Sequence, residues 1–526
     1  MELHASGRNW AIASPTVLAT QAGAAAFERG GNAVDAALAA ATVLAVTYPH
    51  NCGVGGDLFA LVQHPTGDVV AINASGRAPL AIDVAAARAE GDGTSMPAYG
   101  PLSITVPGAT SGWEALHARG AALPWADAFA PAIALAHDGA DVPRSLARKL
   151  QTDGEHLAAD PGIRAVFFPD GEPLAAGELL RQPALGATLQ AVAAEGADAL
   201  YRGEVGARYV DGLRAAGSPM TRTDLAAHTA DLLSPLRGRY RDLDILVVPP
   251  NSQGFVLLEI LAVIERLGID PDPLGPDAPS LARVIRATAS DRDRHLADAD
   301  HMKVHPPTLL DDGHLAAICD EVRGNAGFDE QAGPHEGGDT IALVAADASG
   351  FAVSLIQSLF YGFGSGILEP DTGIVAHDRG AGFTLEAGHP NELSPGKRPA
   401  HTLMPVIVQR EGKPVIVSGS RGGYAQPQIN AANLIRVVDL GMSASVALAA
   451  PRWLSAGMEP ESAEPMILAE DDVPLATRDA LREGGFRIEA IGSHDEHTGH
   501  AHLICVTDKG FDAGSDPRAD GGTVAN

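Results

Sequence analysis

Two apolar runs joined by a short turn constrain the fold of this chain more than any other feature. IALVAAD (residues 341–347) and AVSLIQSL (352–359) have strand-like composition, and Asp347–Gly350 between them has the composition of a turn. This pattern predicts a β-hairpin. The preceding residues, 324–339, are glycine-rich and acidic without periodicity, which predicts a mobile linker. Thr340 therefore marks the point where a linker becomes a strand.

The rest of the chain alternates helical and strand-like patterns. Residues 16–48 predict two packed helices, the second capped by Asn32, and residues 101–235 are mostly helical in pattern. Hairpins are expected at 405–420 and at 502–522, where the last residues form a polar tail. Strand pairs flanked by helices favour a layered α/β architecture with antiparallel sheets.

Acidic residues dominate the charge of the chain. Asp and Glu number 66 against 37 Lys and Arg, which gives a net charge of −29. Such a surface repels phosphate backbones, so we expect no nucleic-acid partner. The first residues show no basic segment followed by an apolar one, and the alanine-rich runs are broken by charges and glycines. We therefore expect a cytoplasmic protein that does not enter a membrane.

Several familiar site signatures are incomplete. Cys52, Cys319 and Cys505 are far apart and odd in number, which argues against a disulfide framework and favours a reducing compartment. The glycines of residues 53–56 lack the GxGxxG spacing of a dinucleotide site. Ser493–His502 holds four histidines and two acids but no HExxH motif, so zinc binding is the weaker interpretation there. We expect neither a cofactor nor a metal.

Many short segments together resemble one protein family. In chain order they are GGNAVDAALAAA, VTYPHNCGVGGDLF, VPGAT, LAHDG, QPALGATL, GADALYRGE, PPNSQG, GDT, SLIQSLFYGFGSGI, PGKRP, SGSRGG, APRW and GSDPRADG. Their order and content resemble the γ-glutamyltransferase superfamily of N-terminal-nucleophile hydrolases, nearly from end to end. The resemblance implies an αββα sandwich of two stacked, mainly antiparallel sheets. It also implies a proenzyme that cleaves itself between Asp339 and Thr340, so that segments 1–339 and 340–526 form a heterodimer within one intertwined domain.

Thr340 matches the nucleophile of that family. A threonine hydroxyl is a weak nucleophile unless a base lies within hydrogen-bond reach. Cleavage before Thr340 would free an α-amine with a pKa of about 8 beside the hydroxyl, which suits it to be that base. The resemblance also matches Ser358 to a second hydroxyl that hydrogen-bonds the nucleophile. Gly422 and Gly423 match the glycines whose backbone N–H groups form the oxyanion hole.

The substrate-binding positions of the family are less well matched. The arginine that holds the carboxylate of γ-glutamyl substrates aligns with Ser75, and Arg77 follows two residues later. The asparagine of the family is Phe360 here. The acidic residue that binds the substrate α-amino group aligns with Gly382. Most of the apparatus for an amino-acid head group is therefore altered.

A further replaced position and three arginines are the remaining candidates for substrate binding. His401 and Thr402 stand where the family has a serine pair, and Arg77, Arg379 and Arg421 are candidate cations for a carboxylate. A site without a buried acid accepts an ammonium group poorly. The sequence therefore predicts amide cleavage of a small carboxylate-bearing acyl donor without an α-amine. The oxamate-hydrolysing branch of the family, which the chain also resembles, fits that description.

Two alternatives remain open at this stage. One is a true γ-glutamyl transpeptidase or glutathione hydrolase with rearranged head-group contacts. The other is an unprocessed, inactive relative that binds a ligand. If the chain is an amidohydrolase or a γ-glutamyl enzyme, the acyl group passes from Thr340 to water or to an amine acceptor.

Overall fold

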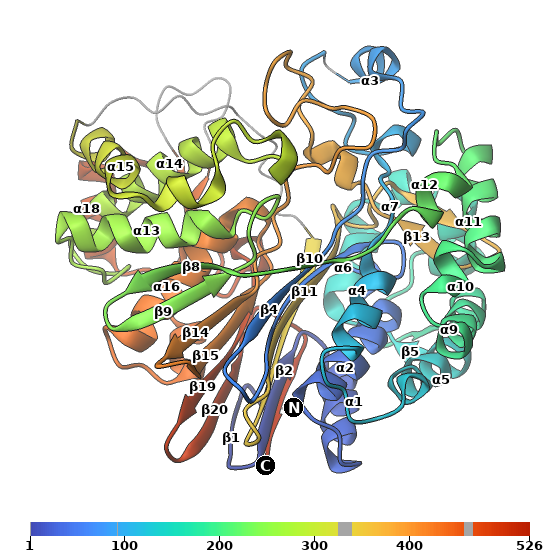
Figure 1. The fold of residues 1–526 in the computed structure, drawn as a ribbon, viewed down its shortest axis with the longest axis horizontal. Helices are drawn as coiled ribbons and strands as arrows, with labels where there is room; N and C mark the ends of the chain where they lie inside the picture. Colours follow the sequence, from blue (N-terminus) through green and yellow to red (C-terminus); the bar gives the residue numbers. More distant parts are fainter. Residues whose placement is uncertain (1, 92, 325–338, 457–465) are drawn as a thin grey trace.

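Two stacked antiparallel sheets form the centre of the molecule, and helices cover their outer faces (Figure 1). The computed structural model describes residues 2–91, 93–324, 339–456 and 466–526. The first sheet has the strand order β1 (His4–Gly7), β20 (Gly510–Ser515), β19 (Ala501–Thr507), β15 (Lys413–Ser420), β14 (Val406–Arg410), β9 (Leu243–Val247), β8 (Leu236–Tyr240). The second has the order β21 (Gly522–Ala525), β2 (Trp10–Ser14), β10 (Asp339–Asp347), β11 (Ala352–Phe360), β3 (Asp57–Gln63), β4 (Val69–Ala74), β7 (Asp231–Leu233). The predicted αββα sandwich is confirmed.

Each sheet carries its own helical layer (Figure 1). The second sheet is covered by α1 (Val17–Glu28), α2 (Ala33–Thr47), α4 (Ala109–His117), α5 (Ala130–Asp138) and α9 (Pro183–Glu195). The first sheet is covered by α13 (Gly254–Leu267), α14 (Ala278–His295), α15 (Asp312–Gly324), α16 (Gln426–Val438) and α17 (Ala444–Ala449). Further helices are α3 (Val84–Glu90), α6 (Arg144–Thr152), α7 (Gly154–Leu157), α8 (Pro161–Phe167), α10 (Asp198–Tyr201), α11 (Glu204–Ala215), α12 (Arg222–Ala226) and α18 (Leu475–Glu483).

Three apolar cores correspond to the three interfaces between layers. One lies between the second sheet and its helices, another between the first sheet and its helices, and a third between the sheets. Alternate residues of β10 divide between two of them. Ile341 and Leu343 face the helices, whereas Ala342 and Val344 face the opposite sheet. Because side chains alternate along a strand, Thr340 belongs to the face that looks toward the opposite sheet.

The N-terminal helix pair forms as the sequence predicts. Asn32 caps α2: its side chain accepts hydrogen bonds from the N–H groups of Val34 and Asp35, and the Asp35 side chain completes a capping box. Alanine dominates both helices, which lets α1 and α2 pack closely together. The hairpins β10–β11, β14–β15 and β19–β20 are likewise confirmed. The predicted polar tail is wrong in part, because Gly522–Ala525 pairs with β2 as an edge strand.

Strands from both sides of the Asp339–Thr340 bond interleave in the second sheet. β2, β3, β4 and β7 precede this bond in the chain, whereas β10, β11 and β21 include or follow it. β10 lies between β2 and β11, so the strand that carries Thr340 is central in the sheet. The division into segments 1–339 and 340–526 stays a prediction. Of the predicted linker, residues 325–338 lie outside the described residues.

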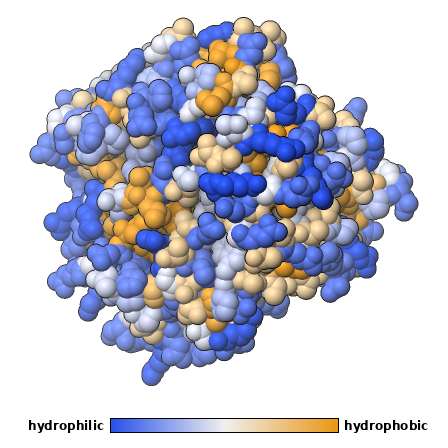
Figure 2. Space-filling model, turned by 45° about the vertical axis from the view of Figure 1, so that its right-hand side comes forward, coloured by the Kyte–Doolittle hydropathy of each residue, from blue (hydrophilic) through white to orange (hydrophobic). Residues whose placement is uncertain are grey.

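The surface view in Figure 2 shows a largely hydrophilic face with hydrophobic residues in small groups. Within the described ranges, no helix combines the length and apolar composition needed to cross a bilayer. Cys52, Cys319 and Cys505 are all buried and unpaired, in agreement with the expected lack of a disulfide framework.

Candidate active site

Thr340 lies at the start of β10, fully buried and directly opposite Ser358 of β11. The Oγ1 atom of Thr340 is 2.9 Å from the Oγ atom of Ser358. The register of the two strands shifts between Asp339 and Thr340, which marks a local irregularity at that peptide bond. The structure therefore brings together the two hydroxyl residues that the sequence analysis paired.

Ser358 contacts both sides of the Asp339–Thr340 bond. Its Oγ atom donates a hydrogen bond to the backbone oxygen of Asp339 at 2.7 Å and accepts one from the N–H of Phe360 at 2.9 Å. Since the single Ser358 proton goes to Asp339, the Thr340 hydroxyl donates to Ser358. Ser358 thus polarises the carbonyl group that precedes Thr340 and orients the Thr340 oxygen at the same time.

The side chain of Asp339 is held by two cations from distant parts of the chain. Arg421 forms an ion pair with one carboxylate oxygen, and Lys149 Nζ lies 3.6 Å from the other. Arg421 is 8% exposed and also lies 3.8 Å from Glu496. Arg421 was a candidate from the sequence, whereas Lys149 was missed because nothing in its local pattern separates it from a surface lysine of α6.

Gly422 and Gly423 form the turn between β15 and α16. Their φ angles are +147° and +53°, a region that favours glycine, and a Cβ atom on Gly422 would lie 2.5 Å from Ile429 Cδ1. Among the described residues, neither backbone N–H group donates to an acceptor. Gln253 donates to the backbone oxygen of Gly423 at 2.9 Å and fixes the turn. The geometry leaves two N–H donors available, as an oxyanion hole requires.

Arg379 is the most unusual side chain near the two hydroxyl groups. It is 1% exposed and its guanidinium carbon lies 3.9 Å from the centroid of the Phe360 ring. Its Nη1 atom donates to the Thr402 hydroxyl at 3.3 Å, and its Nη2 atom lies 3.5 Å from Ser358 Oγ. Within the described part of the chain, no carboxylate lies within 4.0 Å of this guanidinium group, and its Nε atom has no hydrogen-bond partner. Arg379 is therefore a buried cation with unused donor capacity.

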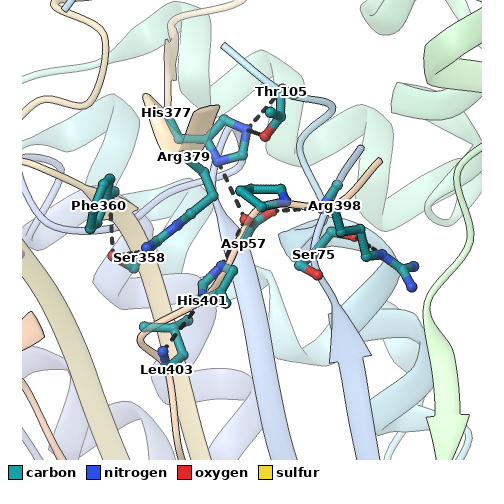
Figure 3. Close-up of polar contacts among 12 residues, drawn as sticks. Asp57, Ser75, Thr105, Ser358, Phe360, His377, Arg379, Arg398, His401 and Leu403 are labelled. Atoms are coloured by element: carbon teal, nitrogen blue, oxygen red, sulfur yellow. Dashed lines mark hydrogen bonds and ion pairs between the residues drawn. The ribbon is translucent and has the colours of Figure 1, made fainter. Parts of the chain in front are cut away.

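A buried carboxylate lies beneath Arg379 (Figure 3). Asp57 Oδ2 accepts a hydrogen bond from His401 Nε2 at 2.9 Å and lies 3.6 Å from His377 Nδ1. Burial raises the pKa of Asp57 to about 7, although the charge of Arg379 works against that shift. Burial also lowers the pKa of His401 well below its ordinary value and that of His377 to about 3, so both rings are neutral at pH 7.

Asp57 and His377 were missed as site residues. Asp57 stands inside the quoted segment VTYPHNCGVGGDLF and His377 precedes Arg379 by two residues, yet neither has a local motif of its own. Asp378 was missed as well: burial raises its pKa to about 8, and its Oδ1 atom accepts a hydrogen bond from the N–H of Tyr361. When ionised, Asp57 and Asp378 favour the charged form of Arg379 from a distance rather than through direct contact.

Arg77 lies apart from this group. Its side chain is 41% exposed, and its Nη1 atom is 3.1 Å from Asp298 and 3.1 Å from the backbone oxygen of Gly396. It lines a cavity of about 260 Å³ that does not include Thr340. Ser75 is buried, and its hydroxyl donates a hydrogen bond to Asn73 Oδ1 at 2.7 Å, a contact within the interior of the fold.

A pocket of about 330 Å³ adjoins the site. It is lined in part by Tyr361 and Tyr424, which neighbour Phe360 and Gly423 in the sequence, and by Gly382. Gly382 presents no side chain to this pocket, whereas Asp293 and Glu386 are acidic residues of its lining. Thr340, Ser358 and Arg379 do not themselves line this pocket.

The histidines of Ser493–His502 do not converge. His497 is mostly exposed and bonds to Asp495, whereas His500 and His502 are buried in and beside β19. Among the described residues, neither ring of that buried pair has a hydrogen-bond partner. The geometry gives no set of metal ligands in this segment.

Comparison with known proteins agrees with this arrangement. The family model described as gamma-glutamyltranspeptidase matches residues 19–526, and the chain belongs to that family. It is 37% identical to an oxamate amidohydrolase proenzyme of Klebsiella pneumoniae, over 97% of each chain. It is 35% identical to the glutathione hydrolase-like YwrD proenzyme of Bacillus subtilis, over 98% of each chain.

Solved structures extend the likeness to the fold. A cephalosporin acylase from Bacillus halodurans matches with a TM-score of 0.91 at 30% identity, covering 100% of this chain and 97% of that one. The γ-glutamyltranspeptidase of Helicobacter pylori matches with a TM-score of 0.53 at 28% identity, over 58% of this chain and 89% of that one. The chain is thus an enzyme of a family whose members include amide-cleaving hydrolases and acylases.

The raised pKa of Asp57 predicts a measurable pH dependence of stability. The folded chain keeps this proton up to about pH 7, whereas the unfolded chain releases it near pH 4, so stability falls as pH rises between these values. Asp57→Asn should flatten this fall by about 1 kcal/mol per pH unit relative to the parent. Urea unfolding between pH 4.5 and 7.5 measures the difference in stability between the parent and the Asp57→Asn variant, both of which carry Thr340→Ala. Parallel curves would contradict the assignment.

Proposed function

We propose that the chain is a self-processing threonine amidohydrolase that acts on a small carboxylate-bearing amide. The observation that carries this proposal is the 2.9 Å contact between the Thr340 and Ser358 hydroxyls beside the buried guanidinium group of Arg379, which has no carboxylate within 4.0 Å among the described residues. The contact supplies an oriented nucleophile, and the guanidinium supplies a cation for a carboxylate. Membership of the family supports amide cleavage as the reaction type.

Self-cleavage uses the bond that Ser358 already contacts. Thr340 Oγ1 attacks the carbonyl carbon of Asp339, whose oxygen accepts the Ser358 hydrogen bond. An ester then forms between Asp339 and Thr340 as the C–N bond breaks, and the nitrogen leaves as the free α-amine of Thr340. Water hydrolyses the ester, which leaves segments 1–339 and 340–526 associated as a heterodimer. The names of several relatives as proenzymes support this step.

Turnover reuses the same atoms. Thr340 Oγ1 attacks the amide carbonyl of the substrate, and its own α-amine accepts the hydroxyl proton and returns it to the leaving amine. The N–H groups of Gly422 and Gly423 stabilise the oxyanion. Water, or an amine acceptor, then releases the acyl group from Thr340. No step requires a cofactor.

The acyl donor that fits best is short. Arg379 Nη2 lies 3.5 Å from Ser358 Oγ, which itself is 2.9 Å from the nucleophile. A carboxylate that binds Arg379 therefore lies close to the reacting carbonyl, as in a monoamide of a small dicarboxylic acid. Thr402 and Phe360 hold the guanidinium group in place. The oxamate amidohydrolase named among the relatives uses a substrate of this class, and we propose oxamate as the first donor to test.

Arg421 and Lys149 provide a second cationic position. In the uncleaved chain they neutralise the Asp339 carboxylate. When Asp339 leaves Thr340 after cleavage, this position becomes available to a negatively charged part of the substrate. Since Gly382 and Phe360 replace the groups that bind an α-amine, an ammonium group would remain poorly compensated there.

A cytoplasmic location of the protein is also part of this proposal.

Loss of the nucleophile should block both activities. Purified Thr340→Ala should give one band near 54.1 kDa on a denaturing gel after long incubation, whereas the unaltered chain gives two smaller bands. Thr340→Ser keeps a hydroxyl group and serves as the control, which should still be cleaved. A single band from the unaltered chain would instead favour an unprocessed, ligand-binding relative.

The choice of acyl donor can be measured directly. Ammonia release from oxamate should exceed release of p-nitroaniline from γ-glutamyl-p-nitroanilide by roughly 10- to 100-fold in kcat/KM, because an ammonium group meets no acid at Gly382 or Phe360. Thr340→Ala gives the background for both assays. Preference for the γ-glutamyl compound would instead favour a true γ-glutamyl transpeptidase or glutathione hydrolase.

Arg379 should control the affinity for the carboxylate. Arg379→Lys keeps the charge but loses the planar fork, and we expect KM for oxamate to rise roughly 10- to 100-fold. Acetamide, which has no carboxylate, should be cleaved equally poorly by both proteins. The matched control is Arg77→Lys, which should leave KM within about twofold because Arg77 pairs with Asp298 elsewhere. Equal effects of the two substitutions would exclude Arg379 from carboxylate binding.

A further inference from the structure

Three helices on the far side of the first sheet bring together four metal-binding side chains. Glu259 lies on α13, Asp291 and His295 on α14, and His314 on α15. Figure 1 shows these three helices side by side, away from the β10–β11 hairpin that carries Thr340. None of the four side chains lines the pocket beside the candidate active site, although their neighbours Arg292 and Asp293 on α14 do.

The distances within this cluster suit a single bound ion. His314 Nε2 lies 2.9 Å from Asp291 Oδ2 and 3.7 Å from Glu259 Oε1. One ligand atom from each of these three residues lies within 4.8 Å of the other two. Ligands that bind zinc at about 2.0–2.2 Å are themselves roughly 3 to 4 Å apart, so the present spacing needs little adjustment.

Glu259 supplies an independent observation. Its side chain is 0% exposed, and among the described residues neither carboxylate oxygen has a hydrogen-bond partner. A buried carboxylate that accepts no hydrogen bond is costly unless a proton or a cation neutralises it.

We propose that Glu259, Asp291 and His314 bind one divalent transition-metal ion of the zinc type. A cation satisfies both carboxylates at once and uses the imidazole nitrogen that points at them. The mixture of carboxylate oxygen and imidazole nitrogen suits Zn²⁺ better than Ca²⁺ or Mg²⁺, which prefer oxygen alone. The proposal is independent of the proposed reaction at Thr340.

The surroundings leave the site negative and accessible. His295 Nε2 lies 3.5 Å from Asp291 Oδ1 and is available as a fourth ligand. Arg294 Nη1 lies 3.8 Å from the same oxygen, and in the described part of the chain no other Lys or Arg nitrogen lies within 4.0 Å of either carboxylate. The side chain of His314 is 23% exposed, which gives an ion a route from solvent. Bound zinc would link α13, α14 and α15 and stabilise the helical layer over the first sheet.

Zinc binding to the tag-free, full-length protein tests the proposal. After treatment with a chelator and dialysis, calorimetric titration with ZnCl₂ should give one ion per chain, and zinc should raise Tm. Glu259→Gln and His314→Gln should each weaken binding by roughly 100-fold or more and abolish the rise in Tm. His305→Gln, an exposed histidine outside the cluster, is the matched control and should bind as the parent does.

Two further measurements make the outcome decisive. Circular dichroism of each metal-free variant checks that the fold persists, and titration with CaCl₂ and MgCl₂ should give no comparable rise in Tm. The proposal is overturned if the parent binds no stoichiometric zinc, or if Glu259→Gln and His314→Gln bind zinc as tightly as the parent. Equal stabilisation by calcium would overturn the zinc assignment.

Discussion

The pairing of β10 with β11 is the constraint on which the candidate site depends. The turn at Asp347–Gly350 sets a register in which Thr340 lies directly opposite Ser358. Gly350 adopts a φ of +104° in that turn, a conformation that side chains disfavour. A slip of one residue would move Thr340 to the helix-facing side of the sheet and separate the hydroxyls. Backbone geometry therefore positions Thr340, the proposed nucleophile, and the apolar residues of β10 fix the face on which it lies.

The buried charge of Arg379 explains several replacements as one set. A guanidinium group without a direct ion pair is expensive to bury, and burial lowers its pKa while Asp57 and Asp378 oppose that shift. Phe360 offers its ring to the cation, and Thr402 accepts a hydrogen bond from it. His401 then restrains Asp57 by a hydrogen bond. The residues that depart from the family pattern thus support one another around a single cation.

Local signals made most of the fold predictable. The Asn32 cap, the alanine-rich helix pair and the three hairpins each depend on residues close in sequence, and each is confirmed. The edge strand Gly522–Ala525 was missed because its partner β2 lies at the opposite end of the chain. Its sequence, GTVA, is too short to distinguish a strand from a tail. Pairing over such a distance leaves no local pattern.

The same difference between local and long-range pairing applies to the candidate site. The contact between Thr340 and Ser358 was predicted, whereas the contacts that surround it were not. Thr340 and Ser358 are eighteen residues apart on one hairpin, so alternation along the strands predicts their contact. Lys149 and Arg421 reach Asp339 from α6 and from the end of β15, and His401 reaches Asp57 across 344 residues. Tertiary packing alone creates these contacts. Backbone pairing within one hairpin brings the two hydroxyl groups together, whereas long-range packing brings the surrounding side chains together. The proposed reaction therefore follows from the sequence more directly than the proposed acyl donor does.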